Sequence, residues 1–217
     1  MLIVAVANTK GGCGKTTVAT HLAAHFAARG LRAGLADLDR QQSARAWLGR
    51  RPAGAAPIVA VDLDVAAGKT PKSLVKRLDR LVVDCPAAMA KDTVKDVVRQ
   101  ADTIVVPVLP SAFDEDGTLR FLKHLMKLKT VRKHQRDVTF VANRVRARTR
   151  AADRLDFFLA DLEFPVAARL RDSQMYANAV AEGLTLFESG GVRAQPLRDE
   201  WAPLFALLEP IGEPAGT

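Results

Sequence analysis

Short runs of apolar and β-branched residues alternate along this chain with longer stretches in which apolar residues recur at helical spacing. Several of the short runs are apolar throughout, which is typical of strands buried on both faces of a parallel sheet. We therefore expect seven strands, the last of them weak, at Leu2–Ala7, Arg32–Ala36, Ile58–Val61, Leu81–Val83, Thr103–Val108, Val138–Ala142 and about Pro165–Arg169.

The stretches between these runs have the apolar spacing of amphipathic helices. Eight helices are expected, at Lys15–Arg29, Gln41–Leu48, Thr70–Leu78, Ala90–Gln100, Glu115–Leu128, Ala151–Leu162, about Ser173–Glu182 and about Arg193–Leu208. Parallel strands joined through helices make right-handed crossovers, so this alternation predicts a doubly wound α/β fold: a mostly parallel sheet with helices on both faces.

The length of the chain and its cysteine content narrow the class of protein. With 217 residues there is enough chain for one domain with its own core and too little for two comfortable ones. We predict a single domain over residues 1–210 and a flexible tail over residues 211–217. Cys13 and Cys85 are too few for a disulfide framework and lack metal-ligand spacing, which favours a reducing, cytoplasmic compartment.

Membrane insertion is not expected from the hydropathy pattern. No apolar run reaches the roughly 18 residues that a membrane-spanning helix needs. Met1–Ala7 is apolar but has no basic leader, and polar Asn8 and Lys10 follow it closely, so it is a poor signal peptide. We therefore expect no membrane partner.

Positive charge is concentrated in one part of the sequence. The net charge is +8, and the window from Arg120 to Arg150 alone holds eleven Lys and Arg against one acid, Asp137. A basic patch confined to one stretch suggests a polyanion surface, although a set of solvated helix faces explains the same pattern. No aromatic residue alternates with these cations, so contact with a phosphate backbone rather than base stacking is the physical expectation.

The strongest chemical signal is a glycine-rich loop between the first strand and the first helix, Lys10-Gly11-Gly12-Cys13-Gly14-Lys15-Thr16-Thr17. Glycines let backbone N–H groups turn toward a phosphate, and the helix N-terminus adds the positive end of its dipole. In such a loop Lys15 reaches the β- and γ-phosphates and the Thr16 hydroxyl binds Mg²⁺. An ordinary Walker A loop has glycine at position 9, where this chain has Thr9.

The lysine at each end of this loop resembles the deviant Walker A sequence of the ParA/MinD class of P-loop ATPases. Asp37–Gln41 is similar to the Asp-x-Asp-Pro-Gln segment of that family, with Arg40 in place of proline. Leu81–Pro86 resembles its Walker B strand, with Cys85 where a small hydroxyl residue is common.

Two later segments extend the resemblance over nearly the whole chain. Val141–Arg144 is similar to the strand end whose asparagine meets the adenine. Arg171–Glu188, with Tyr176 and Gly183, resembles a segment shared by plasmid and chromosome partition ATPases. The short ParA-type partition ATPases are therefore the group that the chain resembles most.

The resemblance implies an ATP hydrolase that converts ATP and water to ADP and phosphate, slowly and with stimulation by a partner. Asp39 would position the attacking water, and Asp84 would hold the Mg²⁺ shell with support from Asp37. An alternative from the residues alone is that Asp37 and Asp39 cap the helix expected at Gln41. The nucleotide-binding residues would be Lys10, Gly11, Gly12, Cys13, Gly14, Lys15, Thr16, Thr17, Asn143 and Arg144.

The same resemblance implies the partners. Lys10 would cross a subunit interface to the nucleotide of a second copy, so that ATP makes a homodimer. That dimer would bind DNA without sequence preference on the nucleoid, and a ParB-like or other cargo adaptor would stimulate hydrolysis. Arg144, Arg146, Arg148 and Arg150 recur at every second position, and in an extended loop Arg146, Arg148 and Arg150 would line one edge and contact successive phosphates.

Two other functions stay open. A MinD-like membrane-associated regulator would need a basic amphipathic C-terminal helix, whereas the apolar segment from Trp201 to Pro210 has two prolines and no Lys or Arg. A metabolic or metallochaperone enzyme of similar fold would need a substrate carboxylate site or cysteine metal ligands, and the sequence offers no Cys-x-x-Cys.

Overall fold

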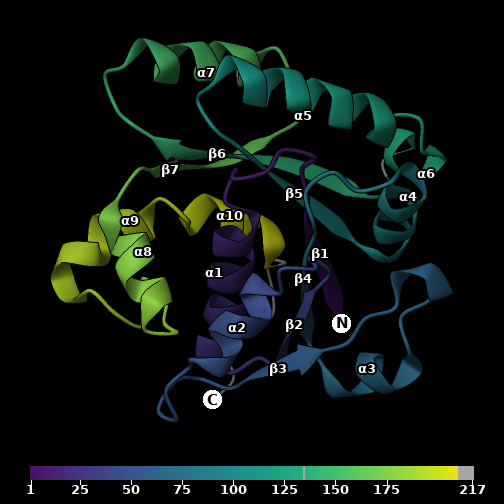
Figure 1. Cartoon of the computed structure of the whole chain (residues 1–217), viewed down its shortest axis with the longest axis vertical. Coiled ribbons are helices and arrows are strands. Elements are labelled where there is room, and N and C mark those ends of the chain that lie inside the picture. Colours follow the sequence, from purple (N-terminus) through teal and green to yellow (C-terminus); the bar gives the residue numbers. More distant parts are fainter. Residues whose placement is uncertain (134, 210–217) are drawn as a thin grey trace.

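Seven strands, paired in parallel throughout, form one twisted sheet in the computed structural model, which describes residues 1–133 and 135–209 (Figure 1). Their order across the sheet is β3-β2-β4-β1-β5-β6-β7. The strands are β1 (Leu2–Val6), β2 (Ala33–Asp37), β3 (Ile58–Val61), β4 (Arg80–Asp84), β5 (Thr103–Val108), β6 (Asp137–Val145) and β7 (Val166–Arg171). All seven expected strands are therefore confirmed, with ends that differ by a few residues.

Helices connect successive strands, as the alternating pattern predicted. The α-helices are α1 (Lys15–Ala28), α2 (Ser43–Gly49), α3 (Lys72–Arg77), α4 (Lys91–Gln100), α5 (Ala112–Leu125), α6 (Lys129–Arg132), α7 (Arg150–Ala160), α8 (Gln174–Ala181), α9 (Gln195–Asp199) and α10 (Ala202–Leu208). Two short 3₁₀ turns are η1 (Val65–Ala67) and η2 (Gly191–Ala194). None of the helices in the described part of the chain is both long and apolar enough to cross a bilayer.

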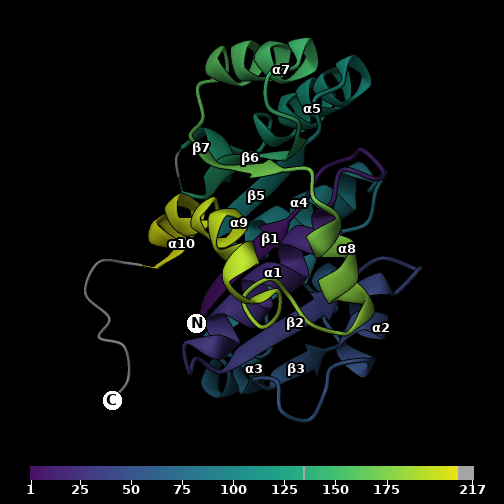
Figure 2. The same ribbon diagram turned by 90° about the vertical axis from the view of Figure 1, so that its left-hand side faces the viewer.

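The sheet separates two hydrophobic cores. Helices α1, α2, α8 and α10 cover one face of the sheet (Figure 2). Side chains of α1, α2 and α10 pack there against β1, β2 and β4, and α8 contributes Tyr176 and Val180. On the other face α4, α5 and α7 pack against the same sheet (Figure 1). Every residue of β4 and β5 is buried, which confirms that the continuous apolar runs are strands covered on both faces.

The strand order places a ligand position at the end of β1. The chain passes from β1 over to β2 and β3 on one side, returns to β4 and then continues through β5 to β7 on the other side. Since all strands run the same way, the loops after β1, β2, β4 and β6 meet at the carboxyl edge of the sheet. In open α/β sheets this reversal of strand order is where ligands bind.

The helix expected at Arg193–Leu208 is wrong as a single element. Pro196 and Pro203 each lie in the first turn of a new helix, where the missing N–H of proline is tolerated, and the chain forms η2, α9 and α10 in turn. The helix expected at Glu115 begins three residues earlier, because the Ser111 side chain caps the N–H of Asp114. The tail predicted for residues 211–217 lies outside the described residues.

An aromatic cluster joins α1 to the C-terminal helices on the face that carries α10. The His21 ring is fully buried and stacks on Trp201 with 5.1 Å between ring centroids. Its Nδ1 lies 2.8 Å from the carbonyl of Thr17, and the N–H of Leu186 donates to Nε2 at 3.3 Å. These two bonds require a neutral ring with its proton on Nδ1, and burial lowers the pKa of His21 to about 4.

We expect His21 to make stability depend on pH below neutrality. Because its folded pKa lies below the unfolded value of 6.5, its contribution is complete above pH 6.5 and is lost as pH falls toward 4. The free energy of unfolding of the wild type should fall by up to about 3 kcal/mol more than that of His21→Gln between pH 7 and pH 4. Urea unfolding of both proteins at each pH measures the difference, in which other titrating groups cancel. Parallel pH profiles would contradict a buried neutral His21.

Candidate nucleotide-binding site

The glycine-rich loop lies between the end of β1 and the start of α1. Gly12 and Gly14 have positive φ values of 77° and 92°, a left-handed conformation that glycine adopts without strain. Gly14 is the N-cap residue of α1, and the first turn of that helix contains no acidic side chain. The free N–H groups at the start of a 14-residue helix thus face a loop suited to an anion.

Asn143 at the end of β6 packs directly against this loop. Its Nδ2 donates a hydrogen bond to the carbonyl of Cys13 at 2.8 Å. A Cβ atom added at Gly14 would lie 2.2 Å from the same nitrogen, which is far inside van der Waals contact. Glycine at position 14 is therefore required both by backbone conformation and by the close approach of Asn143.

Lys15 is turned into the loop and is buried, with 7% of its surface exposed. Its Nζ donates to the carbonyl of Lys10 at 2.9 Å and lies 3.9 Å from Sγ of Cys13. Cys13 is fully buried, and burial raises the pKa of its thiol, so it is a packed neutral group rather than a reactive one. The ammonium group of Lys15 is thus held by the backbone of the loop that it serves.

Thr16 and Asp84 form the oxygen-rich side of the site. The Thr16 hydroxyl donates to Oδ2 of Asp84 at 2.7 Å. Oδ1 of Asp84 is buried and finds no hydrogen-bond partner among the described residues. Burial, with the nearby carboxylates of Asp37 and Asp39, raises the pKa of Asp84 to about 7, against the hydrogen bond from Thr16 and the charge of Lys15.

These two side chains fit a magnesium ion carried by a nucleotide. Hard oxygen donors suit Mg²⁺, which keeps several waters and is bound through one or two protein groups together with phosphates. An unpartnered buried oxygen on Asp84 is the kind of acceptor that an ion or its water would satisfy. In the part of the chain that the structure describes, no group of three or more His, Cys, Asp or Glu side chains could hold a metal.

Asp37 is the last residue of β2, and Asp39 lies in the loop that leads from β2 to α2. Asp37 is the neighbour of Asp84 in the register of β2 and β4. Oδ1 of Asp37 accepts from the N–H of Asp39 and Oδ2 from that of Arg45, each at 3.0 Å. Oδ1 of Asp39 accepts from the N–H of Gln41 at 3.0 Å. Asp37 therefore reaches the first turn of α2, whereas Asp39 shapes the loop before that helix, and the charges of both act on Asp84.

Lys10 takes a different course from Lys15. Its side chain runs along α5, where a Cβ atom on Gly117 would lie 3.3 Å from both Cγ and Cδ of Lys10. Its Nζ stands 5.9 Å from the centroid of the Phe113 ring, and Phe113 is 76% exposed. Of the two loop lysines, Lys15 is therefore enclosed within its own loop and Lys10 lies at the surface of α5.

A cleft of about 580 Å³ extends from the loop toward α8. Its walls carry Gly12, Gly14, Thr17, Asn143, Arg144, Arg146, Asp172, Ser173, Gln174, Tyr176, Ala177 and Val180. Asp172 holds both arginines, at 3.2 Å to Nε of Arg144 and 2.9 Å to Nε of Arg146, and these bonds lower the pKa of its carboxyl. The volume of the cleft and its position beside the phosphate loop suit the base and sugar of a nucleotide.

The predicted row of alternate arginines is wrong in its backbone. Strand β6 continues to Val145, the chain then turns through Arg148 with a φ of 62°, and Thr149 caps α7, whose first residue is Arg150. The arginines therefore do not line one extended edge: Arg144 and Arg146 line the cleft beside α8, whereas Arg148 and Arg150 are exposed and do not line it. Thr149, placed three residues before Ala152, was the sequence signal for this helix start.

Sequence reasoning missed Asp172 and the full role of α8. Nothing in the local pattern distinguishes Asp172, because its importance comes from two arginines that lie 26 and 28 residues away. The family resemblance includes Tyr176 only as one residue of the segment Arg171–Glu188. The structure places Tyr176 in the cleft wall, where its hydroxyl lies 3.0 Å from Nε1 of Trp201.

Comparison with known proteins agrees with this site. A sequence profile described as the CobQ/CobB/MinD/ParA nucleotide binding domain matches residues 4–186. The chain belongs to this family. It is 31% identical over 203 residues to the "Maintenance of carboxysome distribution protein A" of Halothiobacillus neapolitanus, with 91% of each chain covered. The family resemblance inferred from the double-lysine loop is thus confirmed, and proteins of the ParA/MinD family are ATPases.

Solved structures confirm the fold. The chain is similar to an ATP complex of a McdA variant from Cyanothece, with a TM-score of 0.74, 17% identity and coverage of 94% of this chain and 96% of the other. It is also similar to the septum site-determining protein MinD from Pyrococcus horikoshii, complexed with Mg-ADP, with a TM-score of 0.72, 16% identity and coverage of 95% and 96%. The doubly wound P-loop fold is therefore established.

The two left-handed glycines of the loop allow a matched test of its geometry. Gly12→Ala should cost about 1 kcal/mol of unfolding free energy, because only the backbone conformation resists a Cβ there. Gly14→Ala adds a clash with Asn143 and should cost about 1–3 kcal/mol more. Urea unfolding of the nucleotide-free protein measures both. Equal losses for the two variants would show that Asn143 does not press on the loop.

Proposed function

We propose that this protein is a ParA-type ATPase switch. Two copies associate when ATP is bound, the associated form binds DNA without sequence preference, and hydrolysis ends that state. The observation that carries the proposal is the contrast between the two loop lysines: Lys15 is enclosed in its own loop, while Lys10 lies along the surface of α5. A cation in the second position is suited to serve a nucleotide held by another copy.

Within one copy the proposed roles follow from position. Lys15 and the N–H groups at the start of α1 neutralise the β- and γ-phosphates. Thr16 and Asp84 supply oxygen atoms to the Mg²⁺ that accompanies ATP, with Asp37 beside them. Asp39 orients the water that attacks the γ-phosphate. Phosphoryl transfer needs charge neutralisation and alignment more than covalent chemistry, so these groups suffice in kind.

Association through Lys10 would couple dimerisation to the nucleotide. In each copy Lys10 would approach the phosphates of its partner, in the manner of an arginine finger acting in trans. Only ATP-bound copies then gain the contact, so the γ-phosphate sets the dimer population. Slow basal hydrolysis, accelerated by a ParB-like or other adaptor, keeps the dimer long enough to act.

The cargo is proposed from the relatives. The relative from Halothiobacillus neapolitanus is named for carboxysome distribution and covers 91% of this chain, so positioning of a large assembly on the nucleoid is the first candidate. A protein named ParA from Rhizobium radiobacter is 30% identical over 120 residues, or 52% of this chain, which keeps plasmid segregation as the second. Both uses require the same cytoplasmic, DNA-bound switch.

The MinD-like alternative has the fold in its favour and α10 against it. Helix α10 lies on the same face of the sheet as α1 (Figure 2). Its Leu204, Phe205 and Leu208 are buried in the core on that face, so these apolar side chains already pack within the chain. A membrane anchor presents such residues to lipid together with Lys and Arg. We therefore propose DNA rather than a membrane as the supporting surface.

The switch is tested by the size of the protein with nucleotide. Asp39→Ala should bind ATP and accumulate as a dimer, because the attacking water loses its orienting carboxylate. Lys15→Ala should lose nucleotide binding, and Lys10→Ala should bind ATP within about threefold of wild type yet stay monomeric. Light scattering after gel filtration, with ATP or ADP, measures each. A Lys10→Ala variant that dimerises as wild type does would refute the role of Lys10.

The basic stretch is tested in two parts, because Arg146 and the two later arginines have different surroundings. Replacing Arg148 and Arg150 by Glu should weaken binding of non-specific DNA and lower the salt slope of log K by about 2, with ATP affinity unchanged. Arg146→Glu should instead disturb the pair with Asp172 and weaken ATP binding. Fluorescence anisotropy with labelled duplex and labelled ATP measures both. Unchanged DNA affinity in the first variant would make Arg148 and Arg150 a solvated surface.

A further inference from the structure

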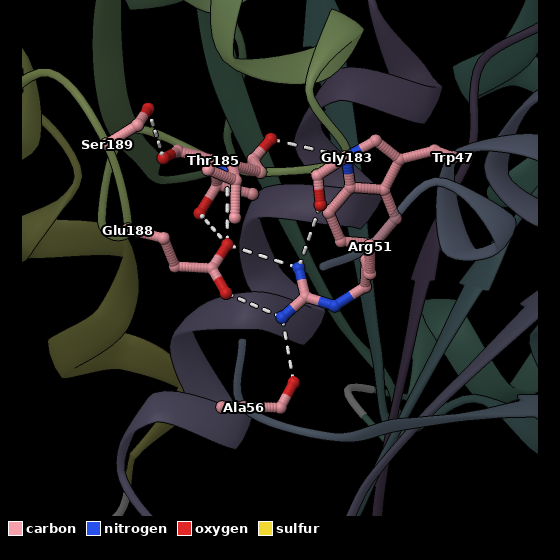
Figure 3. A network of polar contacts seen from close by, with 8 residues as sticks. Trp47, Arg51, Ala56, Gly183, Thr185, Glu188 and Ser189 are labelled. Carbon is pink, nitrogen blue, oxygen red and sulfur yellow. Dashed lines mark hydrogen bonds and ion pairs between the residues drawn. The ribbon is translucent and has the colours of Figure 1, made fainter. Parts of the chain in front are cut away.

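Arg51 follows α2, and its side chain, 8% exposed, contacts several residues of other segments (Figure 3). Nη2 lies 2.5 Å from Oε1 of Glu188 and Nη1 lies 3.1 Å from Oε2, so the pair is bidentate. Nη1 also donates to the carbonyl of Gly183 at 3.2 Å, and Nη2 to that of Ala56 at 2.7 Å. The guanidinium carbon lies 4.8 Å from the centroid of the Trp47 ring.

The segment that receives Arg51, residues 183–189, is held from other elements as well. Trp47 of α2 donates through Nε1 to the carbonyl of Leu184 at 3.2 Å. The N–H and hydroxyl of Thr185 both donate to Oε2 of Glu188, at 3.1 Å and 3.0 Å, which fixes that carboxylate. His21 of α1 accepts from the N–H of Leu186. The segment is therefore anchored to the same helix that begins at the phosphate loop.

The Asp39 loop, residues 38–42, connects the end of β2 to the start of α2. Helix α2 has seven residues and is entered through Gln42, whose φ of 51° is left-handed. Residues 40–43 are exposed. The N–H of Gln41 donates to Asp39 within the loop, and the N–H of Arg45 in α2 donates to Asp37 at the end of β2. On the β2 side the loop is held by the N–H of Leu38, which donates to the carbonyl of Asp84 at 3.0 Å. On the other side it continues into α2, so its position there depends on how that short helix is fixed.

We propose that Arg51 is a positioning residue for hydrolysis, which with Glu188 clamps the end of α2 to the segment 183–189 and thereby fixes the place of Asp39 relative to the phosphate loop. Gly183 shows how close the approach is: a Cβ there would lie 2.4 Å from the carbonyl carbon and oxygen of Arg50. The clamp joins residues 137 positions apart in sequence and connects the end of α2 to a segment that His21 holds on α1. Its kinetic role rests on the proposed ATPase function.

The clamp is tested first without turnover. In nucleotide-free Arg51→Met, amide hydrogens of residues 39–47 should exchange at least about fivefold faster than in the wild type, while those of α4 stay unchanged. Removal of one partner leaves Glu188 buried without its cation, so the double variant Arg51→Met/Glu188→Gln, which removes both charges, is measured beside it. Unchanged exchange at residues 39–47 in a folded variant overturns the clamp.

The kinetic readout separates positioning from general destabilisation. In both variants kcat for ATP should fall about tenfold or more, with the directly measured Kd for ATP within about twofold of wild type, and the effects of Arg51→Met and Glu188→Gln should not add. The matched control is Arg32→Met, which removes another bidentate arginine–carboxylate pair, with Asp79, and should leave kcat unchanged. A kcat equal to wild type, additive losses, or the same loss in Arg32→Met overturns the proposal.

The two proposals fail in different ways. A wild type that hydrolyses no ATP, with its adaptor candidates present, overturns the proposed function and with it the role of Arg51 in turnover. In that case faster exchange in Arg51→Met still identifies the clamp as the support of the Asp39 loop. If the wild type hydrolyses ATP and Arg51→Met does so equally well, only the positioning role is lost.

Discussion

Parallel strand direction is the constraint on which the candidate site depends. All six strand pairings are parallel, so the loops that follow β1, β2, β4 and β6 meet at one edge of the sheet. That edge collects Lys15, Asp37, Asp84 and Asn143 from segments spread over 129 residues. The core on each face of the sheet holds the strands in register, and this register fixes where the side chains of the site lie.

Acidic side chains that repel one another lie close together at this edge, as a site for a cation and a nucleotide requires. Asp84 is buried beside Asp37. Its charged form is stabilised by the hydrogen bond from the Thr16 hydroxyl and by the positive charge of Lys15. Without a bound cation, burial and like charge raise its pKa to about 7, so the site is costly to charge. A magnesium ion with a triphosphate would relieve that cost while satisfying the free N–H groups of α1. The unpartnered oxygen of Asp84 suits a cation, and the first turn of α1, which has no acidic residue, suits the phosphates that accompany it.

Two ion-pair networks next to the site connect the segments that form it. Asp172 pairs with Arg144 and Arg146 at the cleft, so part of the positive charge of the basic stretch is neutralised there. Arg51 and Glu188 join α2 to the segment that His21 anchors on α1. Buried ion pairs of this kind add little net stability, because desolvation offsets their attraction, and their value lies in fixing geometry. The clamp is thereby better understood as alignment of the Asp39 loop than as a source of stability.

The strands, the double-lysine loop and the family followed from sequence alone, because buried parallel strands and a glycine-rich helix start have patterns that are local in the chain. The capping residue Thr149 at the start of α7 is likewise a local signal in the sequence. The pairing of Asp172 with two arginines, the contact of Asn143 with Gly14 and the Arg51–Glu188 clamp could not be predicted in this way. Each joins residues that lie 26 to 137 positions apart, and only packing of helices on a formed sheet brings such residues within hydrogen-bond distance.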